Sequence, residues 1–238
     1  MNFFVNAFNL ILYQPLFNAL VLLYQYLPGH DFGVAVVVLT ILIKVAFYPL
    51  GTIAIRSQKN LSDLQPKLKE IQQKYKDDKE RQAKETMALY QREKINPFSG
   101  CLPLLIQLPI LFALYSLFWK GLQPEQITFL YGFVANPGLI DPSFLGAIDL
   151  SKPNVILALL AGISQFVQSK MTLPKNQASR SAGTSQFGDM MQKQMLYFFP
   201  GFTVLILWNL PSAIGLYWLT STVFSIIQQY LVFKKQVA

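Results

Sequence analysis

The stretch Gly33-Val-Ala-Val-Val-Val-Leu-Thr-Ile-Leu-Ile-Lys44-Val-Ala-Phe-Tyr-Pro-Leu-Gly51 is largely apolar but carries one lysine near its middle. A lysine at the centre of a membrane-spanning helix costs roughly 2.5–3.5 kcal/mol on insertion scales. A chain keeps such a residue only where it has a use, or where water and partners lower the cost. The stretch therefore predicts a membrane protein with a polar site around Lys44.

The composition of the whole chain supports this class. Hydrophobic residues make up 53% and charged residues 13% of the 238 residues, whereas soluble domains contain about 25% charged residues. Most of the chain is therefore expected to face lipid, in a single membrane domain. The only cysteine, Cys101, excludes an internal disulfide and a metal site built from several thiolates.

Five apolar stretches are candidates to cross a hydrocarbon core, which takes about 20 residues. Of the 20 Lys and Arg residues, 17 lie between the first two stretches, in 170–193 or at the C-terminus. Basic segments of this kind stay in the cytoplasm, so 120–152 is expected outside. The fourth stretch is short, and local thinning of the membrane would accommodate it. The five stretches are 33–54, 98–119, 154–171, 195–209 and 212–232.

The chain is thus predicted to be an all-α membrane protein with five spans. The N-terminal segment has two polar helical faces, interrupted at Pro15, and no Lys or Arg. This pattern favours an amphipathic helix in the outer interface over a sixth span, which is the alternative. The predicted parts are the amphipathic helix 1–28, the first span 29–55, a cytoplasmic helical hairpin 56–96, and the other four spans in 97–238, with the outer loop 120–152, the cytoplasmic loop 170–193 and a short basic tail.

Residues 57–95 carry most of the charge and are predicted to form two packed helices. The first helix would restart at Pro66, a turn would follow at 77–79, and the second helix would end at Asn96-Pro97. The hairpin is either a solvated cap or a docking surface and lid, and its net positive charge suits anionic lipids. The packing faces are predicted from Leu61, Leu64, Leu68, Ile71 and Tyr75, and from Ala83, Met87 and Tyr90 on the returning helix.

Apart from Lys170 at the cytoplasmic end of the third stretch, Lys44 is the only charged residue inside the spans, and its neighbours there are neutral polar residues. Taken singly, such groups form interhelical hydrogen bonds worth roughly 0.6 kcal/mol each. Beside a cation without a counter-ion, a shared aqueous cavity explains them better. No nucleophile–base pair, carboxylate dyad or metal cluster can be assembled in the spans, so a non-enzymatic protein without cofactors or metals is expected. The candidate lining residues are Thr40, Gln107, Ser164, Gln165, Gln168, Trp218, Ser221, Thr222, Ser225 and Gln229.

Several motifs resemble those of the YidC/Oxa membrane-protein insertases, in a bacterial short form. They occur in all but the third span and the outer loop, in the order and spacing of that family. At position 44 the family usually has arginine; lysine keeps the charge but loses the planar fork and can be deprotonated. The matching segments are 39–44 with 48–50, 64–67 with 74–78, 96–110 with 113–115, 199–200, 211–218 and 226–229.

The resemblance implies a hydrophilic groove that opens to the cytoplasm and lipid and is closed outside, with the helical hairpin over its entrance. A groove cation, here Lys44, attracts acidic residues of an incoming protein, and the apolar segment slides into lipid along the second and fifth spans. The groove lining carried forward is Lys44, Thr40, Gln107, Ser164, Gln168, Trp218, Ser221, Thr222 and Ser225.

The expected partners are nascent membrane proteins and anionic lipids, with the Sec translocon and the ribosome as further candidates; no direct nucleic-acid recognition is expected. A monomer in the bacterial inner membrane is predicted, with a cytoplasmic C-terminus and the N-terminal helix on the outer face. A non-catalytic assembly scaffold and a small-anion transporter are the alternatives. Replacing Lys44 separates them, because an insertase should tolerate arginine and lose substrates with glutamate, whereas a scaffold should tolerate both.

Overall fold

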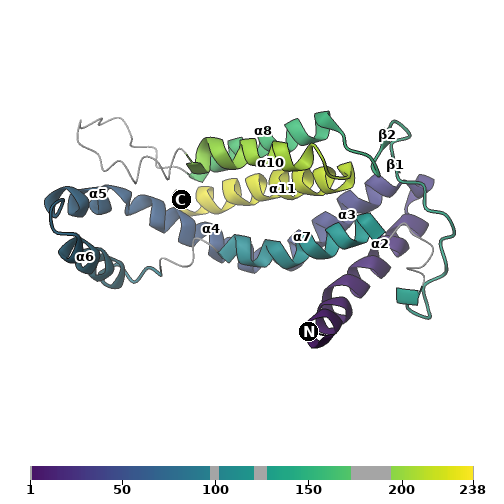
Figure 1. Ribbon diagram of the computed structural model, residues 1–238, viewed down its shortest axis with the longest axis horizontal. Coiled ribbons are helices and arrows are strands. Elements are labelled where there is room, and N and C mark those ends of the chain that lie inside the picture. Colours follow the sequence, from purple (N-terminus) through teal and green to yellow (C-terminus); the bar gives the residue numbers. More distant parts are fainter. Residues whose placement is uncertain (1, 97–101, 121–127, 173–193, 238) are drawn as a thin grey trace.

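The computed structural model describes residues 2–96, 102–120, 128–172 and 194–237, and these residues are mostly helical (Figure 1). The predicted all-α membrane class agrees with this composition of helices. The helices are α1 (Asn2–Phe8), η1 (Asn9–Tyr13), α2 (Gln14–Tyr26), η2 (Pro28–His30), α3 (Phe32–Ala46), α4 (Tyr48–Asp63), α5 (Gln65–Lys74), α6 (Lys79–Arg92), α7 (Leu102–Lys120), α8 (Val155–Thr172), η5 (Gln194–Phe198), α10 (Phe199–Leu207) and α11 (Ser212–Val237).

The long helices run side by side along the molecule, and its two ends differ (Figure 1). At one end lie β1 (Ser143–Phe144) and β2 (Ile148–Asp149), which pair as a short antiparallel hairpin. We call this end, with the loop residues 128–154, the strand end. At the other end α5 and α6 project beyond the bundle, and we call α4–α6 the helical-hairpin end.

The core forms where α8, α10 and α11 pack together and α3 packs on α11. Helix α2 joins the same core, because its apolar face is buried against α3 and α7. This face holds η1 and α2 to the bundle, whereas α1 contacts η1 and its residues Phe3 and Val5 are exposed. The buried residues of η1 and α2 are Tyr13, Phe17, Leu20, Val21 and Tyr24.

Two of the described helical segments are long and apolar enough to cross a membrane, Val5–Tyr26 and Val155–Thr172. A third is added if the bent pair α3 and α4 counts as one span, and Gln107–Phe118 and Leu196–Leu207 are shorter apolar helices. The first of these segments is the one predicted to lie in the interface. The five-span count and the interfacial position of the N-terminal helix both stay predictions.

The stretch 33–54, the first predicted span, is not one straight helix, because the chain breaks at Phe47. Helices α3 and α4–α5 meet there at 70°. Pro49 lies in the first turn of α4; it has no N–H to donate to the carbonyl of Val45, and its ring would clash there in a continuous helix. The apolar first helix therefore ends at Ala46, and α4 leads directly into the helical hairpin.

The helical hairpin has a small core of its own, in which Leu64, Leu68 and Leu89 are buried and Ile71 and Tyr90 pack against them. Burial raises the pKa of Tyr90. The restart at Pro66 is confirmed, since α4 ends at Asp63 and α5 begins at Gln65.

Two predictions about the returning helix of the hairpin are wrong. Ala83 and Met87 are exposed, because α6 is rotated so that Leu89 faces α5. The helix also ends at Arg92 rather than at Asn96, since Lys94 adopts a left-handed conformation with φ of 53°.

Candidate functional site

The amino group of Lys44 lies against α11. Lys44 is in the last turn of α3, and its Nζ donates a hydrogen bond to Ser225 Oγ at 3.1 Å. The Ser225 hydroxyl in turn donates to the carbonyl of Ser221 at 2.9 Å. In the described part of the chain no carboxylate forms an ion pair with Lys44. The cation is thus held by a neutral hydroxyl oxygen, and its charge is available to an anionic group.

Two hydroxyls of the predicted lining are used by their own helices. Thr40 is buried and donates to the carbonyl of Val36 at 2.6 Å. Ser164 is buried in α8 and donates to the carbonyl of Ala161 at 2.8 Å. Thr40 lies one turn before Lys44 on the same face of α3, whereas Ser164 packs in the α8 interface rather than beside the cation.

The remaining predicted residues lie on α11 itself and on α7 and α8, which both pack against α11. Gln107 of α7 donates from Nε2 to the hydroxyl of Tyr217, which is not among the predicted lining residues. Ser221 and Thr222 are buried one turn before Ser225. Gln168 contributes its backbone carbonyl, which accepts a hydrogen bond from Thr172 at 3.1 Å.

A polar junction near the helical-hairpin end was not anticipated. The Thr172 hydroxyl accepts from Gln229 Nε2 at 3.0 Å, and the Thr172 carbonyl accepts from Ser62 Oγ at 2.9 Å. Gln228 Nε2 donates to the Tyr48 carbonyl at 2.8 Å and lies 3.1 Å from Thr52 Oγ1. The only sequence signal was the pair of glutamines inside an apolar helix.

A second junction joins three helices through one amide oxygen. Oε1 of Gln165 in α8 accepts from Trp218 Nε1 of α11 at 2.9 Å and from Thr203 Oγ1 of α10 at 2.8 Å. The indole N–H of Trp218 and the hydroxyl of Thr203 therefore both have a hydrogen-bond partner, on the α8 side of the indole ring.

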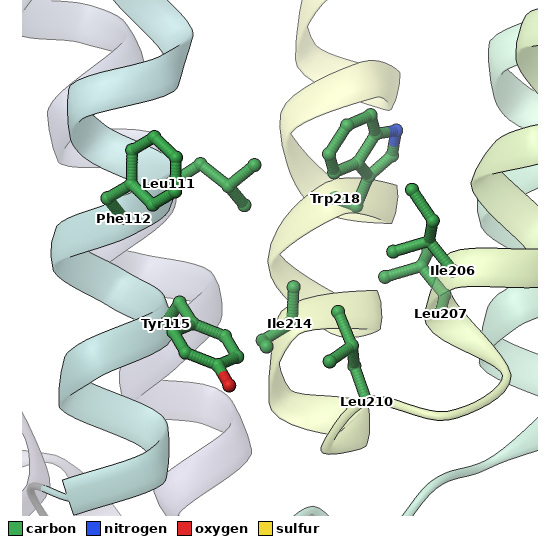
Figure 2. Close-up of a pocket in the computed structure, with 8 residues that line it drawn as sticks. All are labelled: Leu111, Phe112, Tyr115, Ile206, Leu207, Leu210, Ile214 and Trp218. Atoms are coloured by element: carbon green, nitrogen blue, oxygen red, sulfur yellow. The ribbon is translucent and has the colours of Figure 1, made fainter.

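In front of that ring lies an apolar pocket of about 250 Å³ between α7 and the α10–α11 pair (Figure 2). Sequence reasoning could not find it, because its walls come from segments about one hundred residues apart. Its walls are formed by Leu111, Phe112, Tyr115, Ile206, Leu207, Leu210, Ile214 and Trp218.

The cation and the pocket are aligned on α11. Trp218 and Ser225 are seven residues apart, which is two helical turns, so both lie on the same face about 10 Å apart along the axis. Within the described residues no group of three His, Cys, Asp or Glu side chains could hold a metal ion. Fold and site together define a helical membrane protein with a cation and an apolar pocket two helical turns apart along α11.

Comparisons with known proteins give the family. A family model described as the 60Kd inner membrane protein matches residues 22–238. The membrane protein insertase YidC of Fusobacterium nucleatum subsp. nucleatum is 38% identical over 205 residues, which cover 86% of this chain and 87% of that relative. The chain therefore belongs to the YidC/Oxa family of inner-membrane proteins, and the resemblance seen in its motifs is confirmed.

Other relatives are much longer than this chain. The membrane protein insertases YidC of Syntrophus aciditrophicus and Geobacter metallireducens are 37% and 35% identical over 224 and 221 residues. These matches cover 93% and 92% of this chain but only 36% of each relative. The shared part is thus the helical membrane region described above.

Proposed function

We propose that this protein is a membrane-protein insertase and chaperone that works in the bacterial inner membrane, alone or beside the Sec translocon. The names of its relatives support the activity. The observation that carries the mechanism is the placement of Lys44 and the apolar pocket on one face of α11. An incoming protein needs both kinds of site, because its polar end must enter a low-dielectric region while its apolar segment moves toward lipid.

The cation acts on the polar end. A carboxylate near the Lys44 ammonium gains about 4 kcal/mol of Coulomb energy at 4 Å and an effective dielectric constant of 20. Ser225, Ser221, Thr222 and Thr40 add hydroxyls on the two helices beside it. These groups, with Gln107, Ser164, Gln168 and Trp218, form the proposed hydrophilic groove.

The pocket acts on the apolar segment. Its wall between α7 and α11 offers only carbon surface and aromatic rings to an entering helix. Burial of that helix against the pocket and then in lipid contributes about 25 cal/mol per Å² of apolar surface removed from water. A membrane potential that is negative inside assists outward movement of an acidic end by about 2.3 kcal/mol per charge per 100 mV. No nucleotide is needed for this step.

The orientation follows from the distribution of charge. The helical-hairpin end, with 11 Lys and Arg in 56–96, faces the cytoplasm together with the C-terminus, and the strand end faces outward. On the cytoplasmic side the helical hairpin stands beside the groove entrance, where ribosomes and anionic lipids are the candidate partners. The protein acts as a monomer in this scheme.

The test is insertion of a small single-span protein with an acidic outer tail into liposomes that contain only this purified protein, scored by protease protection. We expect protection with wild type and Lys44→Arg, and loss of protection with Lys44→Ala and Lys44→Glu. Lys152→Ala is the matched control, because Lys152 is an exposed lysine at the strand end.

Each other outcome removes one part of the proposal. Equal protection by wild type and Lys44→Ala would remove the role of the cation. Absence of protection with every variant, wild type included, would favour an assembly scaffold. Chloride or phosphate flux that depends on Lys44 would favour a small-anion transporter.

A further inference from the structure

We propose that Gln165 is a positioning residue that fixes the indole of Trp218 so that the apolar pocket presents only carbon to the segment it receives. This inference rests on the proposed function for the identity of the occupant, an apolar segment of an inserting protein. It concerns a residue of α8 whose side chain bonds to Trp218 and Thr203 rather than to Lys44.

The first step is the geometry at the Gln165 amide. Its Oε1 accepts two hydrogen bonds, from Trp218 Nε1 at 2.9 Å and from Thr203 Oγ1 at 2.8 Å. The donors belong to α11 and α10, while Gln165 belongs to α8, so one oxygen ties three helices together. Thr203 is buried, which keeps this junction away from water.

The second step is the direction of the indole. In Figure 2 the nitrogen of Trp218 lies on the side away from α7, whereas the six-membered ring lies on the side toward Leu111 and Phe112. The one polar atom of the ring is therefore turned to the back of the pocket. An indole N–H without a partner in an apolar setting is unfavourable, so the amide of Gln165 stabilises this rotamer over one that turns the nitrogen into the pocket.

The third step is the packing behind the junction. Gly162 lies one turn before Gln165 on α8, and a Cβ added at Gly162 would meet Val204 Cγ2 at 2.3 Å. Helices α8 and α10 therefore approach closely next to the junction. This close approach places the Thr203 hydroxyl within reach of Gln165.

The consequence is selectivity for the side chains of the entering segment. A pocket with carbon walls favours leucine over threonine, because a hydroxyl would lose its partners on entry. When the hydrogen bond from Trp218 to Gln165 is removed, the indole N–H can turn into the pocket and donate to a hydroxyl of the entering segment. We expect the preference for leucine over threonine to fall roughly threefold, the factor that corresponds to one average interhelical hydrogen bond in a membrane.

The experiment uses the full chain in lipid nanodiscs with Trp218 as the sole tryptophan, after Trp119→Phe and Trp208→Phe. The first readout is the NMR resonance of the indole N–H together with the fluorescence anisotropy decay of the ring. Gln165→Met keeps the length of the side chain and removes the acceptor, so we expect a shifted N–H resonance and a faster ring motion. Thr203→Val should loosen the junction partly, and Thr203→Ser should restore it.

The second readout is photocrosslinking from position 112, on the wall opposite Trp218, to a single-span test protein whose apolar segment carries either leucines or threonines. Wild type should crosslink the leucine form more strongly, and Gln165→Met should reduce that ratio. Gln194→Met is the matched control, because Gln194 is an exposed glutamine at the start of η5.

The outcomes separate this inference from the proposed function. If Gln165→Met and Thr203→Val leave the indole signals unchanged, or change them without altering the crosslinking ratio, the positioning role is wrong while the insertase proposal stands. If wild type crosslinks neither test protein from position 112, the pocket does not receive substrate, and the proposed use of the pocket fails together with the selectivity.

Discussion

At the strand end, side chains of helices bond to the backbone of a loop, whereas at the helical-hairpin end they bond mainly from one helix to another. Asn18, Gln25 and Asp31 reach backbone groups of the loop over 129–145. At the opposite end, Lys44, Gln228 and Gln229 reach neighbouring helices. The strand-end bonds hold a loop whose backbone has few hydrogen bonds of its own. The bonds at the helical-hairpin end only set how neighbouring helices are oriented.

The difference follows from where backbone groups find partners. A helix satisfies its own N–H and C=O groups, whereas loop backbone in or near a membrane must receive partners from elsewhere. The strand end therefore needs the hydrogen bonds of Asn18, Gln25 and Asp31, which we call the strand-end clamps, to keep the loop packed on the helices. The helical-hairpin end can lose one contact and remain folded, which suits a site that must admit another chain.

The largest effect is expected from Asn18→Leu. Asn18 is 1% exposed, donates to the Phe129 carbonyl at 2.8 Å and accepts from the Tyr131 N–H at 2.7 Å. Its loss leaves two loop groups without their partner, which costs about 2–3 kcal/mol. Thermal unfolding in detergent and protease cleavage within 128–150 measure the change. Asn6→Leu, at an exposed position of α1, is the control; equal cleavage in both variants would contradict the clamp.

Gly33→Ala should come next. A Cβ at Gly33 would lie 2.2 Å from Cδ2 and 2.5 Å from Cβ of Phe144, so rotation of the ring alone cannot relieve the overlap. Displacing β1 from α3 should destabilise the protein by about 1–3 kcal/mol. Gly132→Ala, with open space around it, is the control. A melting temperature equal to that of wild type would show that β1 is free to move, against the comparison of the two ends.

Gln228→Leu tests the helical-hairpin end. The variant loses the bond to the Tyr48 carbonyl at the 70° bend and the contact with Thr52. We expect a loss of only about 1 kcal/mol of stability but a broader distribution of α5 positions relative to α11. Spin-label distances between residue 73 and residue 219 measure it, with Gln91→Leu as the exposed control. An unchanged distribution with a large loss of stability would reverse the proposed contrast.

The smallest effect is expected from acid at the strand end. Hydrogen bonds from Ser151 and Lys152 lower the pKa of Asp149 to about 2, below the value of about 3.9 for an unfolded chain. A lowered folded-state pKa contributes stability above pH 4, and that contribution is lost as pH falls toward 2. Melting curves at pH 5 and pH 2.5 should show a slightly smaller decrease in Asp149→Asn than in wild type. A decrease as large in the variant would assign the acid effect to other groups.

The sequence by itself determined the class and the family, and it also indicated the restart of the helix at Pro66. Apolar runs, the basic residues of 56–96 and the prolines at 49 and 66 act locally, so they can be read without a fold. The break at Phe47 was also within reach, because Pro49 stands in the quoted stretch; the apolar character of that stretch masked it.

The tertiary structure decided which polar groups meet. Asn18 and Phe129 are 111 positions apart, and Lys44 and Ser225 are 181 positions apart. A helical period shows which residues share a face, but it does not show which helix that face meets or how far a helix is rotated, as Leu89 in place of Met87 illustrates. The partners of Gln165, the pocket beside Trp218 and the clamps of the strand end therefore exist only once the helices have packed, because each depends on contacts between distant segments.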